Sequence, residues 1–399
     1  MTGLAFGVLA AWAGTAKVSG YVLPSAAVDT DDGFGAGARA ALAWQQEGYA
    51  PYKFALQAST YFATSGYMNH RFRFDRTGIG VQKRWRITLH VAYRRWLYDR
   101  YYGIGNLTLR TPGAAQATER SDPAYLSERY RLDQPGGQVT IRYELEQGSP
   151  WEVFLSQGLR YSLVQLYDDS LLEAQQPYGV QGGGVLQVGV GVLHDTRDPE
   201  IAPKRGHFYE LSLRAAPAID AEAGGFGGGL ASARWYASPH PKLTIAHRTM
   251  VEHLLGRVPF YEMVHWGGSE PIAGFGGGNT LRGVPFGRWR GPGKAVAQTE
   301  LRWTFLEHGL LGDPFGWELA PWADVGSAFG AGSDAQPLPE GVELFPVHPG
   351  FGGALRVVYD KTFVGRIDSG VGLDPVLQSD GTIDQRWNWG FYVFADHPF

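Results

Sequence analysis

Residues 85–93 read WRITLHVAY, in which a bulky apolar side chain occupies every second position. The odd positions, from Trp85 to Tyr93, are aromatic or aliphatic, whereas the even positions carry Arg, Thr, His and Ala. A period of two residues indicates a β-strand with one apolar face and one more polar face. The same alternation recurs in three further stretches, at 186–192, 209–213 and 301–305. The sequence therefore predicts an all-β chain.

The two faces of these strands favour a membrane barrel over a soluble β-sandwich. A sandwich buries a face of mixed aliphatic side chains and exposes a polar face. Here the apolar face is rich in Trp, Tyr and Phe, which make up 14% of the chain, and the other face carries many Arg, Glu and Asp side chains. Such faces are typical of a barrel with lipid outside and water inside.

The bulk composition agrees with this interpretation. Gly accounts for 56 of 399 residues, and the chain is poor in helix formers. Mean hydropathy of -0.21 resembles that of a soluble protein, but a barrel gives the same average because only alternate side chains meet lipid. Cys is absent, which excludes disulfides and thiolate metal sites. A net charge of -4 gives no reason to expect a nucleic-acid partner.

Turn residues divide the chain into about sixteen alternating segments, an even number as bacterial single-chain barrels require. If the first strand rises from the periplasm, the links that follow odd-numbered strands are extracellular and long. The long links do follow odd-numbered strands: 102–124, 166–183, 257–293, 329–348 and 374–386. The sequence predicts one domain, residues 17–399, folded as a 16-stranded antiparallel transmembrane β-barrel.

The two ends of the chain carry targeting signals. The apolar stretch from Leu4 to Ala13 is too short for a membrane-spanning helix, which needs about 20 residues. We expect residues 1–16 to be the remnant of a signal peptide or a disordered leader. At the other end, an alternating strand that carries an aromatic face resembles the β-signal read by the outer-membrane assembly machinery: Trp389, Phe391 and Phe399. Alternatively, Phe399 only anchors the strand at the membrane interface. Both interpretations place the chain in the bacterial outer membrane.

Four motifs point to a known family. The link 257–293 contains GGGNTLRGV at residues 276–284, which resembles the V/I/L-R-G-F/Y loop signature of the BamA, TamA and FhaC superfamily, also called the bacterial surface antigen family. WADVG at 322–326 resembles its F-x-D-x-G strand, and the last three residues are similar to its common terminus. Segment 194–206 resembles its periplasmic turn, with five matching residues: Asp195, Arg197, Asp198, Pro199 and Gly206.

The chain departs from the family pattern at three points. Val284 stands where the loop signature usually has an aromatic residue, and Trp322 stands where the strand motif has Phe. Family members that handle client proteins usually carry polypeptide-transport-associated repeats before the barrel. Here the first expected strand begins near residue 20, which leaves no room for such a repeat.

The resemblance implies a loop inserted into the lumen between strands 11 and 12, with Arg282 and Gly283 at its tip. A buried guanidinium needs carboxylate partners. Asp324 and Glu300 lie on the inward phase of their strands, because the residue after each is on the apolar face. The resemblance implies a bidentate pair between Arg282 and Asp324, with Glu300 as a second acceptor. Alternatively, Arg282 is one of many lumen charges without a fixed partner.

Other residue groupings favour structural roles. The glycines of the GFGAG stretch at 33–37 are followed by a strand pattern rather than the helix of a nucleotide site. His194, Asp195 and Asp198 lack metal-ligand spacing and fit a turn. A set of inward charges is expected to tune the lumen: Arg71, Arg73, Arg86, Arg94 and Arg366 near Asp368. No catalytic motif stands out, so we expect neither an enzyme nor a cofactor.

The resemblance implies a function in inserting or translocating proteins, or lipids, through a lateral seam between the first and last strands. Two alternatives stay open: a narrow channel or surface barrel that inserts nothing, and the barrel subunit of a larger complex. The expected partners are the lipid bilayer and periplasmic or outer-membrane proteins, with no nucleic acid.

Overall fold

The computed structural model describes most of the chain: residues 7–13, 16–30, 32–49, 51–110, 113–114, 117–200, 202–217, 225–310, 313–331, 347–359, 363–378, 380 and 382–394. Within the predicted leader, residues 1–6 and 14–15 lie outside this description, and Gly7–Ala13 forms strand β1. Whether residues 1–16 are removed as a leader stays a prediction.

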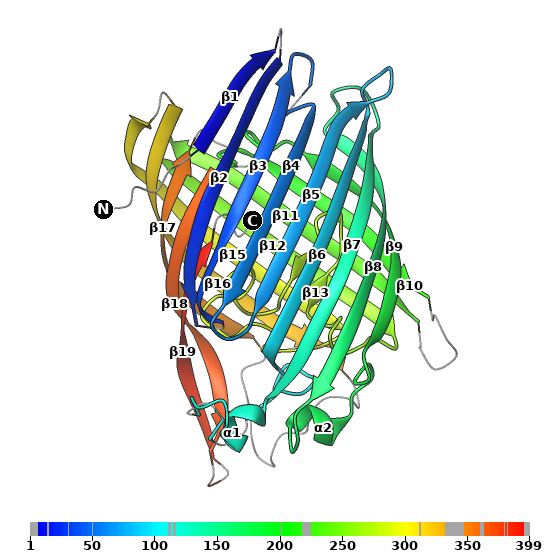
Figure 1. Ribbon diagram of the computed structural model, residues 1–399, viewed down its shortest axis with the longest axis vertical. Helices are drawn as coiled ribbons and strands as arrows, with labels where there is room; N and C mark the ends of the chain where they lie inside the picture. Colours follow the sequence, from blue (N-terminus) through cyan, green and yellow to red (C-terminus); the bar gives the residue numbers. More distant parts are fainter. Residues whose placement is uncertain are drawn as a thin grey trace.

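Sixteen antiparallel strands in the described residues form the wall of one barrel, which confirms the predicted fold class (Figure 1). Each wall strand pairs with the next along the chain, and β2 and β19 are neighbours in the sheet. The first eleven are β2 (Ala16–Asp29), β3 (Gly33–Gln46), β4 (Phe54–Ala63), β5 (Met68–Ile79), β6 (Trp85–Arg100), β7 (Arg129–Glu144), β8 (Trp151–Leu166), β9 (Gly183–Asp195), β10 (Gly206–Ala216), β11 (Phe226–His240) and β12 (Leu243–Gly256). The last five are β15 (Gly293–Leu310), β16 (Asp313–Phe329), β17 (His348–Tyr359), β18 (Phe363–Leu377) and β19 (Ile383–Phe394).

The two ends of the barrel differ in the length of their links. Tight turns join strands at one end, at the top of Figure 1, whereas the links after β6, β8, β12 and β16 at the other end are long. Two short helices lie in these links, α1 (Pro123–Leu126) and α2 (Leu171–Gln175). No helix in the described part of the chain is long and apolar enough to cross a membrane. By the parity argument the end with long links is extracellular.

The last strand differs from its predicted limits. The sequence places a long link at 374–386 and the last strand after it, but β19 spans Ile383–Phe394, because β18 continues to Leu377 and pairs with Ile383 there. The turn is therefore a short one at 378–382, where Asp380 accepts a hydrogen bond from the Thr382 backbone (2.9 Å). The predicted long link at 374–386 is wrong. The terminal residues 395–399, including Phe399 of the expected β-signal, lie outside the described residues.

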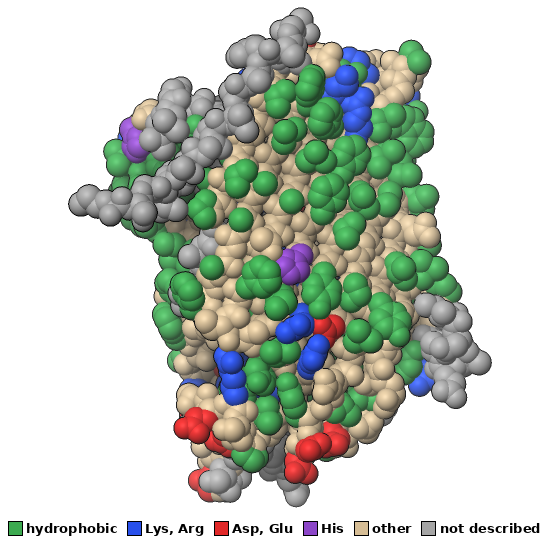
Figure 2. All heavy atoms as spheres, viewed as in Figure 1, with side chains coloured by type: hydrophobic (Ala, Val, Ile, Leu, Met, Phe, Trp, Pro, Cys, Tyr) green, Lys and Arg blue, Asp and Glu red, His purple; other side chains and the backbone are tan. Residues whose placement is uncertain are grey.

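The wall is apolar outside and polar inside, as the alternation predicts. On β10 the outward Leu211 and Leu213 are each 63% exposed, whereas the inward Glu210, Ser212 and Arg214 are buried. Figure 2 shows apolar side chains spread over the outer face, with most Lys and Arg near the upper rim or lower down the wall and Asp and Glu near the lower rim. Because large apolar side chains cover this outer surface, the wall fits contact with lipid.

A charge on this outer face should destabilise the barrel. Replacing Leu211 with Arg puts a guanidinium against lipid near the middle of β10, which costs about 2–4 kcal/mol of folding free energy at the bilayer midplane. Denaturant unfolding in lipid vesicles measures this loss. The control is Gln82→Arg in the exposed β5–β6 turn, which should change stability little. Equal stability of both variants would contradict the assignment of this face to lipid.

Candidate functional site in the barrel lumen

The link between β12 and β15, residues 257–292, forms a loop that folds into the lumen. Its first part contains a small hairpin of β13 (His265–Trp266) and β14 (Ile272–Ala273). The indole Nε1 of Trp266 donates to the Gly274 carbonyl at 3.0 Å. This bond and the hairpin give polar groups of the loop hydrogen-bond partners within the loop itself. A backbone placed at membrane depth requires such internal partners.

The loop tip is a tight turn built from the GGGNTLRGV motif. The Gly277 amide donates to the Val284 carbonyl at 2.9 Å, and the Thr280 hydroxyl lies 3.1 Å from both the amide and the carbonyl of Gly276. Gly283 has a φ of 92°, and a Cβ there would meet the backbone of Val371 at 2.3 Å. Only glycine combines this conformation with so close an approach to the wall.

The side chain of Arg282 projects from this turn into a set of three carboxylates and is fully buried. Its Nε and Nη2 bind the two oxygens of Asp324 at 2.8 and 2.7 Å, and its backbone amide donates to the same group at 3.0 Å. Nη1 donates to Glu300 at 2.7 Å and to Asp368 at 2.9 Å. The structure thus brings Arg282, Asp324 and Glu300 together and adds Asp368, whose part in the site the sequence did not indicate.

Three further arginines complete what we call the Arg282 network. Arg302 and Arg356 bind Glu300 at 2.9 and 2.5 Å, and Arg366 binds Asp368 at 2.5 Å. The network therefore holds four guanidinium groups and three carboxylates, supplied by the loop and by β15, β16, β17 and β18. Removing one member of a buried ion pair leaves the charge of its partner uncompensated. Each such removal lowers the folding stability by about 3–5 kcal/mol.

The surroundings of Trp322 explain why Trp stands where the family's strand motif has Phe. The Arg282 guanidinium lies 4.1 Å from the centre of the Trp322 ring, and an indole is the strongest cation–π partner among aromatic side chains. Gly352 and Gly370, which pair in the register of β17 and β18, make room for the larger ring. A Cβ at either glycine would meet a Trp322 ring atom within 2.6 Å.

The tip also binds the last strand of the barrel. The Asn388 side chain on β19 donates to the Gly283 carbonyl at 2.8 Å. The Tyr392 hydroxyl accepts from the Gly283 amide and donates to the Val284 carbonyl, both at 3.3 Å. Val284 itself is fully buried among Phe275, Leu281, Trp289 and other apolar side chains of the loop and wall. The loop tip and β19 therefore form one bonded unit.

A second anchor lies nearer the extracellular end. Arg288 binds Asp374 of β18 at 2.5 Å, and its Nη1 and Nη2 donate to the hydroxyl and carbonyl oxygens of Thr108, each at 3.0 Å. The Gly105 amide donates to the Arg290 carbonyl at 2.7 Å. These contacts join the lumen loop to the 101–128 link. The sequence did not indicate them, although the Arg288-Trp289-Arg290 run in a buried loop was a signal that partners must exist.

The acidic residues of the loop also bind the wall. Glu262 pairs with Arg160 of β8 at 2.7 Å, and Glu270 pairs with Arg234 of β11 at 3.2 Å. In the reverse direction, the Gly267 amide donates to Glu252 of β12 at 2.9 Å. The loop is thus bound to strands on several sides of the lumen and is part of the folded barrel.

The residues of the predicted periplasmic turn form a compact structure between β9 and β10. Asp195 accepts from the Arg197 amide at 3.0 Å and binds its guanidinium at 2.8 Å. Asp198 is paired with Arg205, and Pro199 follows it within the same turn. At Gly206 φ is 93°, and a Cβ would meet the Thr196 carbonyl.

His194, considered above as a metal ligand, packs against a second histidine, and the expected β-signal residues Trp389 and Phe391 contact neighbouring strands. His194 stacks on His207, with its Nδ1 2.9 Å from the His207 Nε2, and the described residues contain no group of His, Asp and Glu that could hold a metal ion. Trp389 on β19 is 56% exposed on the outer face and its Nε1 donates to the Ser369 hydroxyl at 3.0 Å. Phe391 lies at the junction with β2, where its carbonyl accepts from the Thr30 amide at 3.2 Å.

The lipid-facing wall and the loop bound inside it define an outer-membrane β-barrel whose lumen is partly filled by its own extracellular link. The chain belongs to the Omp85 superfamily: it matches the Omp85 superfamily domain over residues 67–391. No curated protein sequence matches it.

Three solved structures share the fold. BamA from Haemophilus ducreyi lacking POTRA domains 1-3 matches 98% of this chain and 75% of its own, with 11% identity and a TM-score of 0.53. CdiB from Acinetobacter baumannii has 13% identity and a TM-score of 0.51, covering 94% of this chain and 59% of its own. CdiB from Escherichia coli has 12% identity and a TM-score of 0.54, covering 93% and 62%. The chain thus spans less than two thirds of either CdiB, and at these identities the likeness shows the fold alone.

Charge reversal at Asp324 should release the loop. Asp324→Lys places a cation against Arg282 in a fully buried site, so the variant should lose the heat-modifiable migration of the folded barrel on gels, or keep it with a protease-sensitive loop. The control is Asp380→Lys in the exposed β18–β19 turn, which should behave as wild type. Wild-type migration together with wild-type protease resistance in Asp324→Lys would contradict the pairing role of Arg282.

Proposed function

We propose that the chain is a scaffold that inserts or translocates proteins through the outer membrane by opening the seam between β2 and β19. The observation that carries this proposal is the unequal pairing around the barrel. The β18–β19 ladder runs from Leu377 and Ile383 to Arg366 and Phe394, and β2 pairs with β3 along its whole length. The described parts of β2 and β19 lie close together over a much shorter stretch than any other two neighbouring wall strands, and just after β2 the Thr30 amide donates to the Phe391 carbonyl (3.2 Å).

The edge of β2 that faces β19 also accepts a second strand. Over Ala16–Val22 this edge pairs with β1, whereas β19 meets it near Thr30 (Figure 1). An edge strand with unpaired backbone groups is a template for an added strand. The pairing of β1 with β2 is the geometry that a client strand would adopt at the same edge.

The lumen loop links the seam to the Arg282 network. The tip is held by Arg282 to β15, β16 and β18 and is bonded to Asn388 and Tyr392 of β19. Opening the seam therefore has two routes: β19 moves together with the loop, or β2 moves away from β19 while the network stays intact. The second route breaks fewer buried bonds, so β2 and β3 are the mobile side in this proposal.

A disulfide across the seam tests the proposal. The chain has no Cys, so Thr30→Cys with Phe391→Cys introduces the two thiols alone. The assay is the rate at which liposomes containing the protein fold a small eight-stranded outer-membrane barrel added from urea. We expect the wild type to accelerate folding at least about 10-fold over empty liposomes, and the oxidised variant to lose this acceleration until reductant is added.

The matched control places the same two thiols in a continuous ladder. Val190 and Leu213 face each other across β9 and β10, so Val190→Cys with Leu213→Cys should leave the acceleration unchanged when oxidised. Full acceleration by the oxidised seam variant would exclude lateral opening. No acceleration by the wild type would remove insertion of such barrels as the function.

A further inference from the structure

The inner face of the barrel is electrostatically divided. On β10, on β18 and in the lumen loop, arginines meet carboxylates, as in the pairs Arg214–Glu252 (2.9 Å), Arg288–Asp374 (2.5 Å) and Arg366–Asp368 (2.5 Å). On β3 to β8, five arginines line a single cavity whose described lining contains no Asp or Glu: Arg39, Arg71, Arg73, Arg94 and Arg160. This cavity is not part of the seam or of the Arg282 network.

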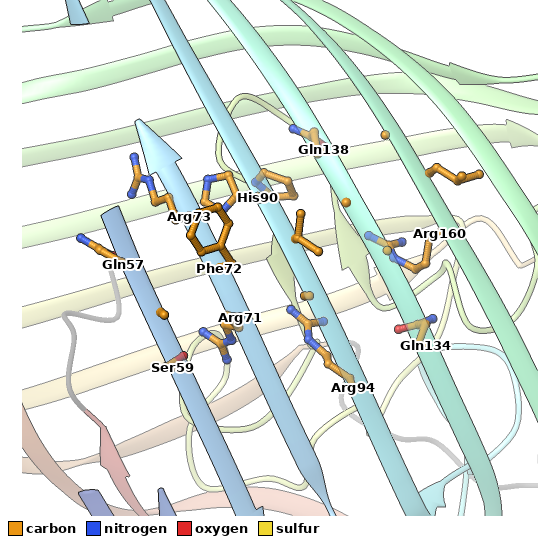
Figure 3. A pocket seen from close by; sticks show the side chains of 18 of the residues that line it. Gln57, Ser59, Arg71, Phe72, Arg73, His90, Arg94, Gln134, Gln138 and Arg160 are labelled. Atoms are coloured by element: carbon orange, nitrogen blue, oxygen red, sulfur yellow. The ribbon is translucent and has the colours of Figure 1, made fainter. Parts of the chain in front are cut away.

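The cavity lies between the wall and the lumen loop, which reaches it at Pro271. Its volume is about 400 Å³, within the range of about 300–1,000 Å³ that small-molecule sites occupy. Figure 3 shows Arg71, Arg94 and Arg160 lying in sequence across β5, β6 and β8. Neutral hydrogen-bonding side chains surround them: Gln57, Ser59, His90, Gln134 and Gln138.

The strand register brings the arginines close together. Ser59 of β4 pairs with Arg39 of β3 on one side and with Arg71 of β5 on the other. Arg94 of β6 pairs with Asn69 of β5, two residues from Arg71. Since neighbouring strands lie about 4.8 Å apart, these guanidinium groups can converge on one ligand.

Carboxylates do not neutralise the centre of this cluster. The Nε of Arg71 donates to the Asn69 side chain at 3.1 Å, which is a neutral acceptor. Among the residues that the structure describes, no carboxylate makes an ion pair with Arg71 or Arg94. Two other arginines, Arg71 and Arg160, act on Arg94 electrostatically, and because they carry the same positive charge they do not neutralise it.

The edges of the cluster are only partly compensated. Arg73 lies 3.5 Å from Asp75, but this carboxylate also binds Arg86 at the shorter distance of 2.6 Å. The Nε of Arg73 is buried and has no hydrogen-bond partner in the described part of the chain. On the far side, Arg160 is paired with Glu262 of the loop. The cavity therefore combines surplus positive charge with an unused buried donor.

We infer that this cavity binds a soluble polyvalent oxyanion that carries phosphate groups. Guanidinium groups present planar, paired donors that match phosphate oxygens, and they keep their charge when water is excluded. The wall strands enclose the cavity, so a free anion reaches it through the lumen, whereas a lipid phosphate would have to bring its acyl chains inside. The arginines on β3, β5, β6 and β8 thus form a ligand site that is separate from the seam and from its proposed function.

Titration calorimetry with inorganic pyrophosphate on the purified full chain in a zwitterionic detergent tests the site. We expect saturable binding to the wild type that weakens with salt, and at least about 10-fold weaker binding to Arg71→Gln with Arg94→Gln, because charge-assisted bonds are lost. The control is Arg131→Gln on β7, which removes an arginine already paired with Asp133 and should bind as wild type.

A second measurement separates a ligand site from a structural cluster. Without phosphate the double variant should unfold at a higher temperature than the wild type, since like charges no longer repel one another. A lower unfolding temperature, or pyrophosphate binding equal to that of the wild type, would overturn the inference. So would the absence of saturable binding to the wild type. Displacement of pyrophosphate by phosphatidic acid added to the micelles would overturn the soluble source and assign the site to a lipid phosphate.

Discussion

The guanidinium of Arg282 is fully buried inside the barrel, and such a charge is tolerated only where carboxylates surround it. Asp324, Glu300 and Asp368 meet this condition from three different strands. Their inward positions require the register of β15, β16 and β18 to be correct to the residue, since a shift by one would turn the carboxylates to lipid. The position of the loop and the register of this side of the wall therefore depend on each other.

The strands that are bonded to the lumen loop are held in place more firmly than β2. The loop is hydrogen-bonded to Asn388 and Tyr392 of β19, so the last strand is one of those that the loop holds. Across the seam, β2 is bonded to β3 along its length but shares its other edge between β1 and β19. The proposed insertion function needs a barrel that parts at one place without unfolding elsewhere, and this unequal bonding supports the proposal.

Much of the fold could be predicted from the sequence, because alternation such as that of residues 85–93 is a local property of the chain. The predicted start of the last strand, β19, was wrong, because the turn around Asp380 is short although the residues on either side of it resemble a long link. The Arg282–Asp324 contact followed from a family motif. Partners such as Arg288 with Thr108 could not be predicted, since a contact between two long links depends on how both fold. The basic cavity needs the register of six strands, which no single segment contains.

A double-mutant cycle on Arg282 and Asp324 tests the central claim most directly. The free energy of unfolding in lipid vesicles would be measured for wild type, Arg282→Ala, Asp324→Ala and the double variant. If the pair holds the loop, each single variant leaves a buried charge unpaired and the coupling energy exceeds about 1 kcal/mol. A coupling energy near zero, with the two losses simply adding, would mean that Arg282 has no specific partner and would contradict the account.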